Sequence, residues 1–300
     1  MSDLNLPNLV IAGVARGGTT SLFSYLGAHP DICPSRRKET EYFSPLHDGG
    51  ALAPLASYAA NFSHCRDERY RMEATPGYMF GGERIARAIQ DTLPDARIII
   101  MLRDPTARAV SFFKFFKSRF HLPKEMTFPD YIAGCHERCS LDKAARAIAP
   151  EYGALHSGLY AEFILPWFEI FGDRLMVTFS DQLKDKSGLM TQLCDWLGLD
   201  GGAVDWEELR VFNPSAMYRG AALHRLALWF NNSAEPFLRR HERLKTQLAR
   251  IYSRVNAQQS EQIDTSTLAE LREYFDPYNR RLGDMLREQG YTELPDWLNA

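Results

Sequence analysis

The sequence lacks an apolar run long enough to span a membrane, and it lacks an excess of positive charge. A membrane helix needs about 20 consecutive apolar residues, whereas the first apolar run begins at Leu9 and is soon interrupted by glycines. The formal net charge is −3, and proteins that bind nucleic acid broadly carry a strong positive excess. We therefore expect no membrane span and no nucleic-acid partner.

Cysteine is scarce, and so are the features of a secretory signal. The five cysteines are widely spaced, and an odd count favours reduced thiols over a disulfide framework. The N-terminal segment carries Asp3 and no basic residue before its first apolar run, unlike a signal peptide. Both observations predict a cytoplasmic protein. Cys135 and Cys139 enclose His136, but a zinc site usually needs a second such pair, so a metal site is the weaker hypothesis.

Continuous apolar segments indicate buried strands. The chain has 300 residues, 45% of them hydrophobic, enough for one sizeable core. Apolarity without alternation is typical of parallel strands that are covered on both faces. Such segments lie at residues 9–14, 96–102 and 174–179. Helical patterns at residues 19–27 and 163–171 alternate with them. This alternation predicts an α/β fold with a parallel sheet.

Beyond Arg219 the chain has a helical pattern. Helices are expected at residues 223–230, 238–252 and 266–289. We expect these helices to pack on the sheet domain and to form one wall of a cleft. Their aromatic residues could also supply the contact face of a homodimer.

A glycine-rich turn joins the first predicted strand to the first helix. Residues 10–22 read VIAGVARGGTTSL, where Gly17 and Gly18 allow positive φ and close approach of a ligand. The helix start offers free N–H groups to an anion, and Arg16 adds a planar donor fork. Hydroxyl donors follow at Thr19, Thr20 and Ser21. A plain strand-to-helix turn would use the same residue types. This loop alone therefore leaves two interpretations open, an anion-binding site and an ordinary turn.

A second candidate phosphate element follows the strand at residues 96–102. Asp104 is a good N-cap and Pro105 is favoured at the first helical position, so a helix should begin there. Arg103 then lies at the carboxyl end of the strand, where open α/β sheets bind ligands. Ser111 lies two turns into the helix. The alternative is that Arg103 is a surface charge and Ser111 an ordinary helix residue.

Together the two elements resemble the sulfotransferase superfamily, especially its heparan sulfate N- and O-sulfotransferase branch. The first is similar to the family's 5′-phosphosulfate loop, [KR]-x-G-T-T-x-L, and the second to its 3′-phosphate element, R-D-P-x-x-R-x-x-S. Other segments resemble this branch at residues 38–43 (KETEYF), 73–78 (EATPGY) and 294–298 (LPDWL). The resemblance implies a single domain over residues 1–300, with a P-loop-like sheet core at about 8–215 and a helical C-terminal part at about 216–300.

The resemblance implies a chemistry and a set of site residues. The expected reaction moves a sulfuryl group from 3′-phosphoadenosine 5′-phosphosulfate (PAPS) to a hydroxyl or amine, without a metal, and releases adenosine 3′,5′-bisphosphate. Glu39 is the expected base, and Arg16 would offset charge on the leaving phosphate. The implied PAPS-binding residues are Arg16, Gly17, Gly18, Thr19, Thr20, Ser21, Arg103, Ser111, Arg219 and Gly220.

The acceptor side is less well defined by the sequence. A carbohydrate or another small molecule is expected, either free or bound to a carrier. Candidate acceptor-binding residues are Lys38, Glu41, Thr75, Tyr78 and Lys114. Lys114 lies in the segment SFFKFFKSRFH, whose aromatic residues Phe112, Phe116 and Phe120 align on one helix face and are predicted to enter the core.

The sequence departs from the family pattern at three positions. Arg16 stands where most relatives have lysine, Glu41 where they have histidine or glutamine, and Ala74 where lysine is common. Arginine keeps its proton, so Arg16 could stabilise a leaving phosphate but could not protonate it.

Two other classes of protein remain as alternatives. A metal-dependent kinase would need a P-loop lysine in register, which the glycine loop lacks. A non-catalytic nucleotide-binding regulatory protein would bind PAPS without turnover.

Overall fold

The computed structural model describes residues 4–139, 149–209 and 263–299. The chain divides into two compact units. The first comprises residues 1–108, 156–212 and 272–300, and the second residues 109–155 and 213–271. Three predictions lie outside the described residues: the helices at 223–230 and 238–252, and the PAPS ligands Arg219 and Gly220.

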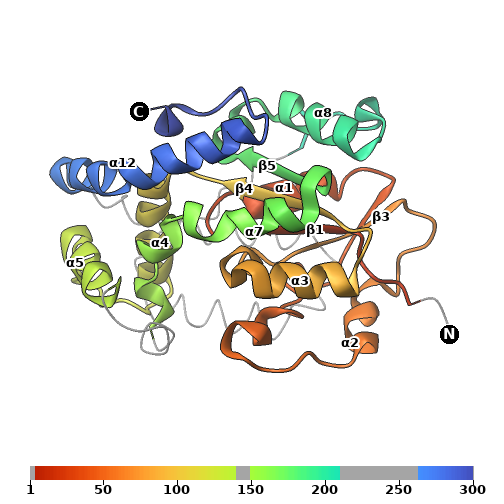
Figure 1. The fold of residues 1–300 in the computed structure, drawn as a ribbon, viewed down its shortest axis with the longest axis horizontal. Helices are drawn as coiled ribbons and strands as arrows, with labels where there is room; N and C mark the ends of the chain where they lie inside the picture. The colour runs from red at the N-terminus through yellow and green to blue at the C-terminus, as the bar shows by residue number, and fades with distance from the viewer. Residues whose placement is uncertain (1–3, 140–148, 210–262, 300) are drawn as a thin grey trace. The chain divides into compact units, whose positions relative to one another are not determined.

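The first unit is built on a five-stranded parallel sheet with the order β2-β3-β1-β4-β5 (Figure 1). Its strands are β1 (Leu9–Gly13), β2 (Ile32–Pro34), β3 (Tyr70–Ala74), β4 (Arg97–Leu102) and β5 (Leu175–Phe179). The predicted α/β class is confirmed, as are the strands that correspond to β1, β4 and β5. The other two were missed because β2 has only three residues and β3 carries the polar residues Arg71 and Glu73.

Helices alternate with these strands along the chain. They are α1 (Thr19–Leu26), α2 (Leu55–Ala59), α3 (Gly82–Thr92), α4 (Pro105–Ser118), α5 (Phe128–Cys139), α7 (Ala161–Phe171), α8 (Lys186–Leu197) and α12 (Thr265–Glu288). Short 3-10 helices include Ser44–Asp48, Ala60–Phe62, Tyr78–Gly81 and Ser180–Lys184. The predicted helices at residues 19–27, 163–171 and 266–289 are confirmed as α1, α7 and α12. Within the described ranges, every helix is too short or too polar to cross a bilayer.

Apolar residues cover both faces of the sheet in the first unit. Val10 and Ala12 of β1 belong to a core shared with α3 and α7, which lie side by side over one face (Figure 1). Leu9 and Ile11 point the other way, into a core shared with α1 and α8. This two-sided burial explains why β1 is apolar at every position rather than at alternate ones.

The second unit contains an aromatic cluster. The ring of Phe113 lies 5.5 Å from that of Phe128 and 5.3 Å from that of Tyr131. These contacts join the part of α4 beyond Arg108 to α5. The core prediction is right for Phe112, which is 9% exposed, and wrong for Phe120, which is 39% exposed. Phe120 lies outside the core because α4 ends at Ser118 and cannot carry the helical register further.

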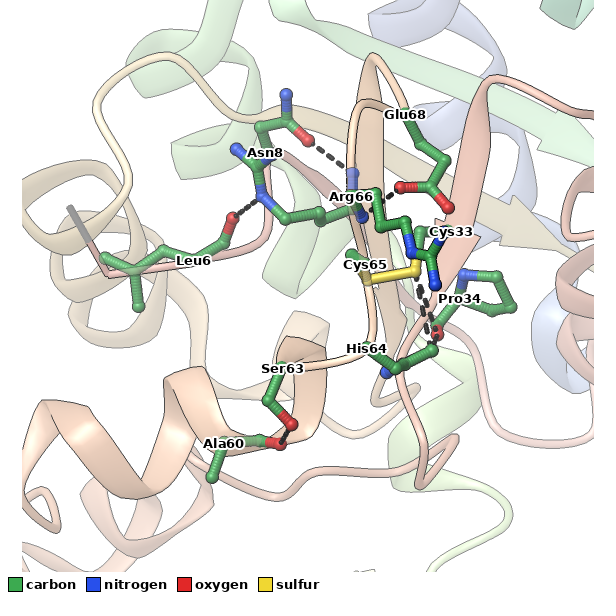
Figure 2. Close-up of a disulfide and its surroundings, with 11 residues drawn as sticks. Leu6, Asn8, Cys33, Pro34, Ala60, Ser63, His64, Cys65, Arg66 and Glu68 are labelled. Carbon is green, nitrogen blue, oxygen red and sulfur yellow. Dashed lines mark hydrogen bonds between the residues drawn. A yellow bond between two sulfur atoms is a disulfide. The ribbon is translucent and has the colours of Figure 1, made fainter.

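A disulfide joins Cys33 of β2 to Cys65, which follows the 3-10 helix Ala60–Phe62 (Figure 2). The prediction of five reduced thiols is therefore wrong for this pair. The two cysteines are 32 positions apart in sequence, but their Cα atoms lie 5.7 Å apart. The pairing depends on how the chain returns from α2 to β3, which the cysteine count does not reveal. The other three cysteines, Cys135, Cys139 and Cys194, are not in a disulfide.

Candidate functional site

The glycine-rich loop leaves β1 and ends at the N-terminus of α1. Val14 N–H donates to Met101 O of β4 at 2.9 Å, and Gly17 N–H donates to Val14 O at 2.9 Å. Arg16 and Gly18 both adopt positive φ, 66° and 101°. This conformation costs a non-glycine residue about 1–2 kcal/mol, whereas glycine adopts it readily. The loop is thus a closed turn whose shape depends on its glycines.

Steric crowding also requires glycine at positions 17 and 18. A Cβ on Gly17 would lie 2.7 Å from Met101 O, and one on Gly18 would lie 2.7 Å from Leu183 Cδ1. Among the described residues, no side chain caps the start of α1, and its first turn holds no acid. The positive end of the helix dipole therefore faces no acidic side chain in this turn, and the binding of an anion there stays a prediction.

The second predicted element meets this loop. Thr106 N–H donates to Asp104 Oδ1 at 2.9 Å, which confirms Asp104 as the N-cap of α4. Arg103 Nη1 donates to Arg16 O at 3.1 Å. Tyr160 O–H donates to Arg103 O at 2.8 Å and fixes the chain at this point. The two motif elements therefore lie together at the carboxyl ends of β1 and β4.

Arg108 has a role that the sequence did not reveal. Its Nε donates to Ala15 O and its Nη2 to Ser157 Oγ, both at 2.8 Å. The side chain is fully buried, and its guanidinium lies over the rings of Phe80 and Tyr160 at 5.5 and 5.8 Å. Its position in the motif R-D-P-x-x-R was the available signal, but a motif does not separate an arginine that supports the loop from one that binds a ligand.

Two predicted site residues lie on α4 within the second unit. Ser111 is buried at 7% exposure, and Lys114 is half-buried one turn further along the helix. The expected contact of Ser111 with PAPS and the expected contact of Lys114 with an acceptor stay predictions.

We define the acceptor loop as residues 38–43, which carry the predicted base. Lys38 Nζ pairs with Glu39 Oε1 at 2.9 Å, and the Glu39 side chain is 51% exposed. Glu39 is therefore accessible to an incoming molecule. Glu41 has a positive φ of 57°, and Ser44 Oγ–H donates to its carboxylate. The acceptor loop thus contains a strained residue two positions after the predicted base.

A buried carboxyl lies against the acceptor loop. Glu73 is fully buried, and Thr40, Tyr58 and Thr75 donate to its two oxygens through their hydroxyls. Tyr78 OH lies 3.3 Å from Thr40 Oγ1. Burial raises the pKa of Glu73 to about 7, although the hydroxyl contacts act to lower it. The resemblance covered Glu73 without giving it a role.

Thr75 and Tyr78 are fully buried as well. Glu41 N–H donates to Thr75 Oγ1 at 3.4 Å, and Phe43 N–H donates to Tyr78 OH at 3.2 Å. Both side chains therefore support the acceptor loop from within the protein. Their predicted contact with an acceptor stays a prediction.

Comparisons with known proteins agree on one family. The family model for a sulfotransferase domain matches residues 6–264. Human heparan sulfate glucosamine 3-O-sulfotransferase 3B1 is 30% identical over 199 residues, which cover 65% of this chain and 46% of the relative. Mouse heparan sulfate glucosamine 3-O-sulfotransferase 6 is 29% identical over 203 residues, which cover 66% of this chain and 54% of the relative. The chain thus spans about half the length of these relatives.

A crystal structure of a sulfotransferase from Alicyclobacillus acidocaldarius has a similar fold. It aligns with a TM-score of 0.67 at 22% sequence identity, over 97% of this chain and 98% of the other.

Proposed function

The chain belongs to the sulfotransferase domain family, and from this membership we propose that it transfers the sulfuryl group of PAPS to an acceptor and releases adenosine 3′,5′-bisphosphate. One observation carries the proposal. Arg103 Nη1 binds the carbonyl oxygen of Arg16 at 3.1 Å, so both phosphate elements face one edge of the sheet, where α/β folds bind ligands.

In the proposed reaction, an acceptor oxygen or nitrogen attacks sulfur. The bond between sulfur and the bridging oxygen breaks, and adenosine 3′,5′-bisphosphate leaves with that oxygen. Glu39 takes the acceptor's proton. Arg16 and the N–H groups at the start of α1 stabilise the charge that grows on the leaving phosphate. These groups carry the charge that a metal ion would carry in a kinase.

We propose a carbohydrate acceptor of anionic character. Both relatives are named as enzymes that act on heparan sulfate glucosamine. In this chain, Arg36 and Arg37 are exposed and precede Lys38 and Glu39, so three cations adjoin the proposed base. Such a cluster suits a sulfated or carboxylated sugar. A carrier-bound acceptor, a homodimer and a cytoplasmic location remain predictions from the sequence.

Ligand-induced thermal stabilisation tests the nucleotide site. Adenosine 3′,5′-bisphosphate at micromolar concentration should raise the melting temperature of the protein, and Arg103→Ala should abolish the shift. ATP with Mg²⁺ serves as the rival ligand. A shift with ATP and Mg²⁺ but none with the bisphosphate would overturn the proposal and favour a kinase.

Transfer of radiolabelled sulfate from PAPS to N-sulfated heparan oligosaccharides tests the second half of the reaction. Incorporation that is lost in Glu39→Gln supports the proposal. Bisphosphate binding without transfer to any of a wide acceptor panel would favour the non-catalytic nucleotide-binding protein.

A further inference from the structure

The carboxyl of Glu73 is buried without a positively charged partner among the described residues. Its side chain has 0% exposure, and its hydrogen-bond donors include the hydroxyls of Thr40, Tyr58 and Thr75. Burying a carboxyl among apolar and aromatic groups is costly even when hydroxyls satisfy it. A contribution to the site would account for a carboxyl in this position.

Its place in the sheet puts Glu73 next to the candidate site. Glu73 of β3 is paired with Val10 of β1, and the following pair is Ala74 with Ile11. β1 ends at Gly13 and continues into the glycine-rich loop. Glu73 thus lies one residue from the carboxyl end of β3, beside the strand that leads to the proposed phosphosulfate site.

Two anchors hold the backbone on either side of Glu39. Before it, Lys38 O accepts a hydrogen bond from Ala74 N–H at 3.2 Å. After it, Thr40 Oγ1–H donates to Glu73 Oε2. The predicted base therefore sits between two residues that are both attached to the end of β3. Of these two anchors, the one after Glu39 is made by the Glu73 side chain.

The remainder of the acceptor loop is fixed by groups that surround the same carboxyl. Thr75, which donates to Glu73 at 3.1 Å, also accepts from Glu41 N–H at 3.4 Å. Glu41 has the positive φ of 57°, a conformation that persists only where neighbouring contacts enforce it. Tyr78 accepts from Phe43 N–H at 3.2 Å and lies 3.3 Å from Thr40 Oγ1.

We propose that Glu73 is a positioning residue that holds the acceptor loop and thereby places Glu39 for proton removal from the acceptor. This proposal rests on the sulfotransferase function proposed above. Glu73 touches neither the acceptor nor PAPS, and it acts through Thr40 and Thr75.

Three variants separate positioning from general stability. Glu73→Gln keeps the size of the side chain but replaces one acceptor oxygen with a donor. Thr40→Val removes the hydroxyl that joins the acceptor loop to Glu73. Tyr58→Phe is the matched control. It removes one hydrogen bond that reaches the same carboxyl from α2, and it keeps the ring that stacks on Tyr42 of the acceptor loop at 4.2 Å.

Hydrogen exchange measured on the whole 300-residue chain gives a readout that does not depend on activity. Peptides covering residues 36–46 report the amides of Glu41 and Phe43, which are hydrogen-bonded to Thr75 and Tyr78. We expect exchange there to rise about tenfold or more in Glu73→Gln and Thr40→Val but not in Tyr58→Phe. Unchanged exchange at residues 9–13 of β1 would establish that each variant is folded.

Steady-state kinetics give the second readout. Glu73→Gln and Thr40→Val should lower kcat by about 10- to 100-fold, since a small displacement of a catalytic group has effects of this size. The KM for PAPS and the affinity for adenosine 3′,5′-bisphosphate should stay at the wild-type values, as should kcat in Tyr58→Phe.

The outcomes distinguish this proposal from the one on which it rests. Wild-type exchange at residues 36–46 in both variants would overturn the positioning role, and so would an equal loss of kcat in Tyr58→Phe. Failure of the wild-type protein to bind the bisphosphate would overturn the proposed function. In that case the exchange experiment would still decide whether Glu73 holds the acceptor loop.

Discussion

Breaking the disulfide between Cys33 and Cys65 should destabilise the folded protein by a predictable amount. The bond closes a segment with a sequence separation of 32. In the chain-entropy model, a cross-link over about 32 residues lowers the entropy of the unfolded chain enough to contribute about 3.7 kcal/mol at 25 °C. We expect this loss in Cys33→Ala/Cys65→Ala. Alanine is preferred to serine because both sites are buried, at 4% and 6% exposure, and a buried hydroxyl would add its own cost.

Urea unfolding followed by tryptophan fluorescence measures this loss. With an m-value of about 3 kcal/mol/M, the midpoint should fall by roughly 1 M. Reductant should lower the wild-type midpoint by a similar amount and should leave that of the double variant unchanged, because the variant has no disulfide to reduce. Thiol titration of the unfolded, unreduced wild type should count the three cysteines outside the disulfide, Cys135, Cys139 and Cys194. Five reactive thiols, with a midpoint insensitive to reductant, would refute the reasoning.

Three further predictions follow from the site. Burial raises the pKa of Glu73 from 4.5 to about 7, so its contribution to stability is fully present below pH 4.5 and is lost as the pH rises through about 7. The unfolding free energy of the wild type relative to Glu73→Gln should therefore be about 3 kcal/mol larger at pH 4 than at pH 8.5. A difference that stays constant between these two pH values would contradict this account. Gly18→Ala should lower the free energy of unfolding by about 1–2 kcal/mol and weaken bisphosphate binding at least tenfold in calorimetry, because Gly18 has φ 101° and a Cβ there would contact Leu183. Gly290→Ala is the control, since Gly290 has a similar φ of 87° in open space, and it should leave binding unchanged. Arg108→Lys should lower both the melting temperature and the bisphosphate affinity, since one ammonium group cannot reproduce the contacts that the planar guanidinium makes to Ala15 and Ser157. Wild-type affinity in this variant would show that the glycine-rich loop does not need the guanidinium.

Local features of the fold could be predicted from the sequence. β1, β4 and β5 were identifiable because each is apolar throughout, as strands buried on both faces must be. The start of α4 was identifiable because aspartate is favoured as an N-cap and proline as the first helical residue, and Asp104 and Pro105 take these positions here.

Features that depend on long-range contacts could not be predicted. The network at Glu73 joins Thr40, Tyr58 and Tyr78, which lie on a loop, α2 and a 3-10 helix, and no sequence spacing reveals this convergence. Glu73 is also a polar residue within β3, and it made the sequence of β3 unlike that of a buried strand. The disulfide depends in the same way on the path of the chain between β2 and β3.

The contacts of Arg103 and Arg108 with the glycine-rich loop have a consequence for its electrostatic potential. A peptide loop presents both oxygens and N–H groups, and only the latter attract an anion. Here the carbonyl oxygens of Arg16 and Ala15 each accept a hydrogen bond from a guanidinium. The negative ends of these carbonyl dipoles are therefore neutralised before any ligand arrives. Loss of either arginine would remove a positive charge and also uncover a carbonyl dipole. The affinity lost for a doubly phosphorylated nucleotide should then exceed what one missing cation accounts for.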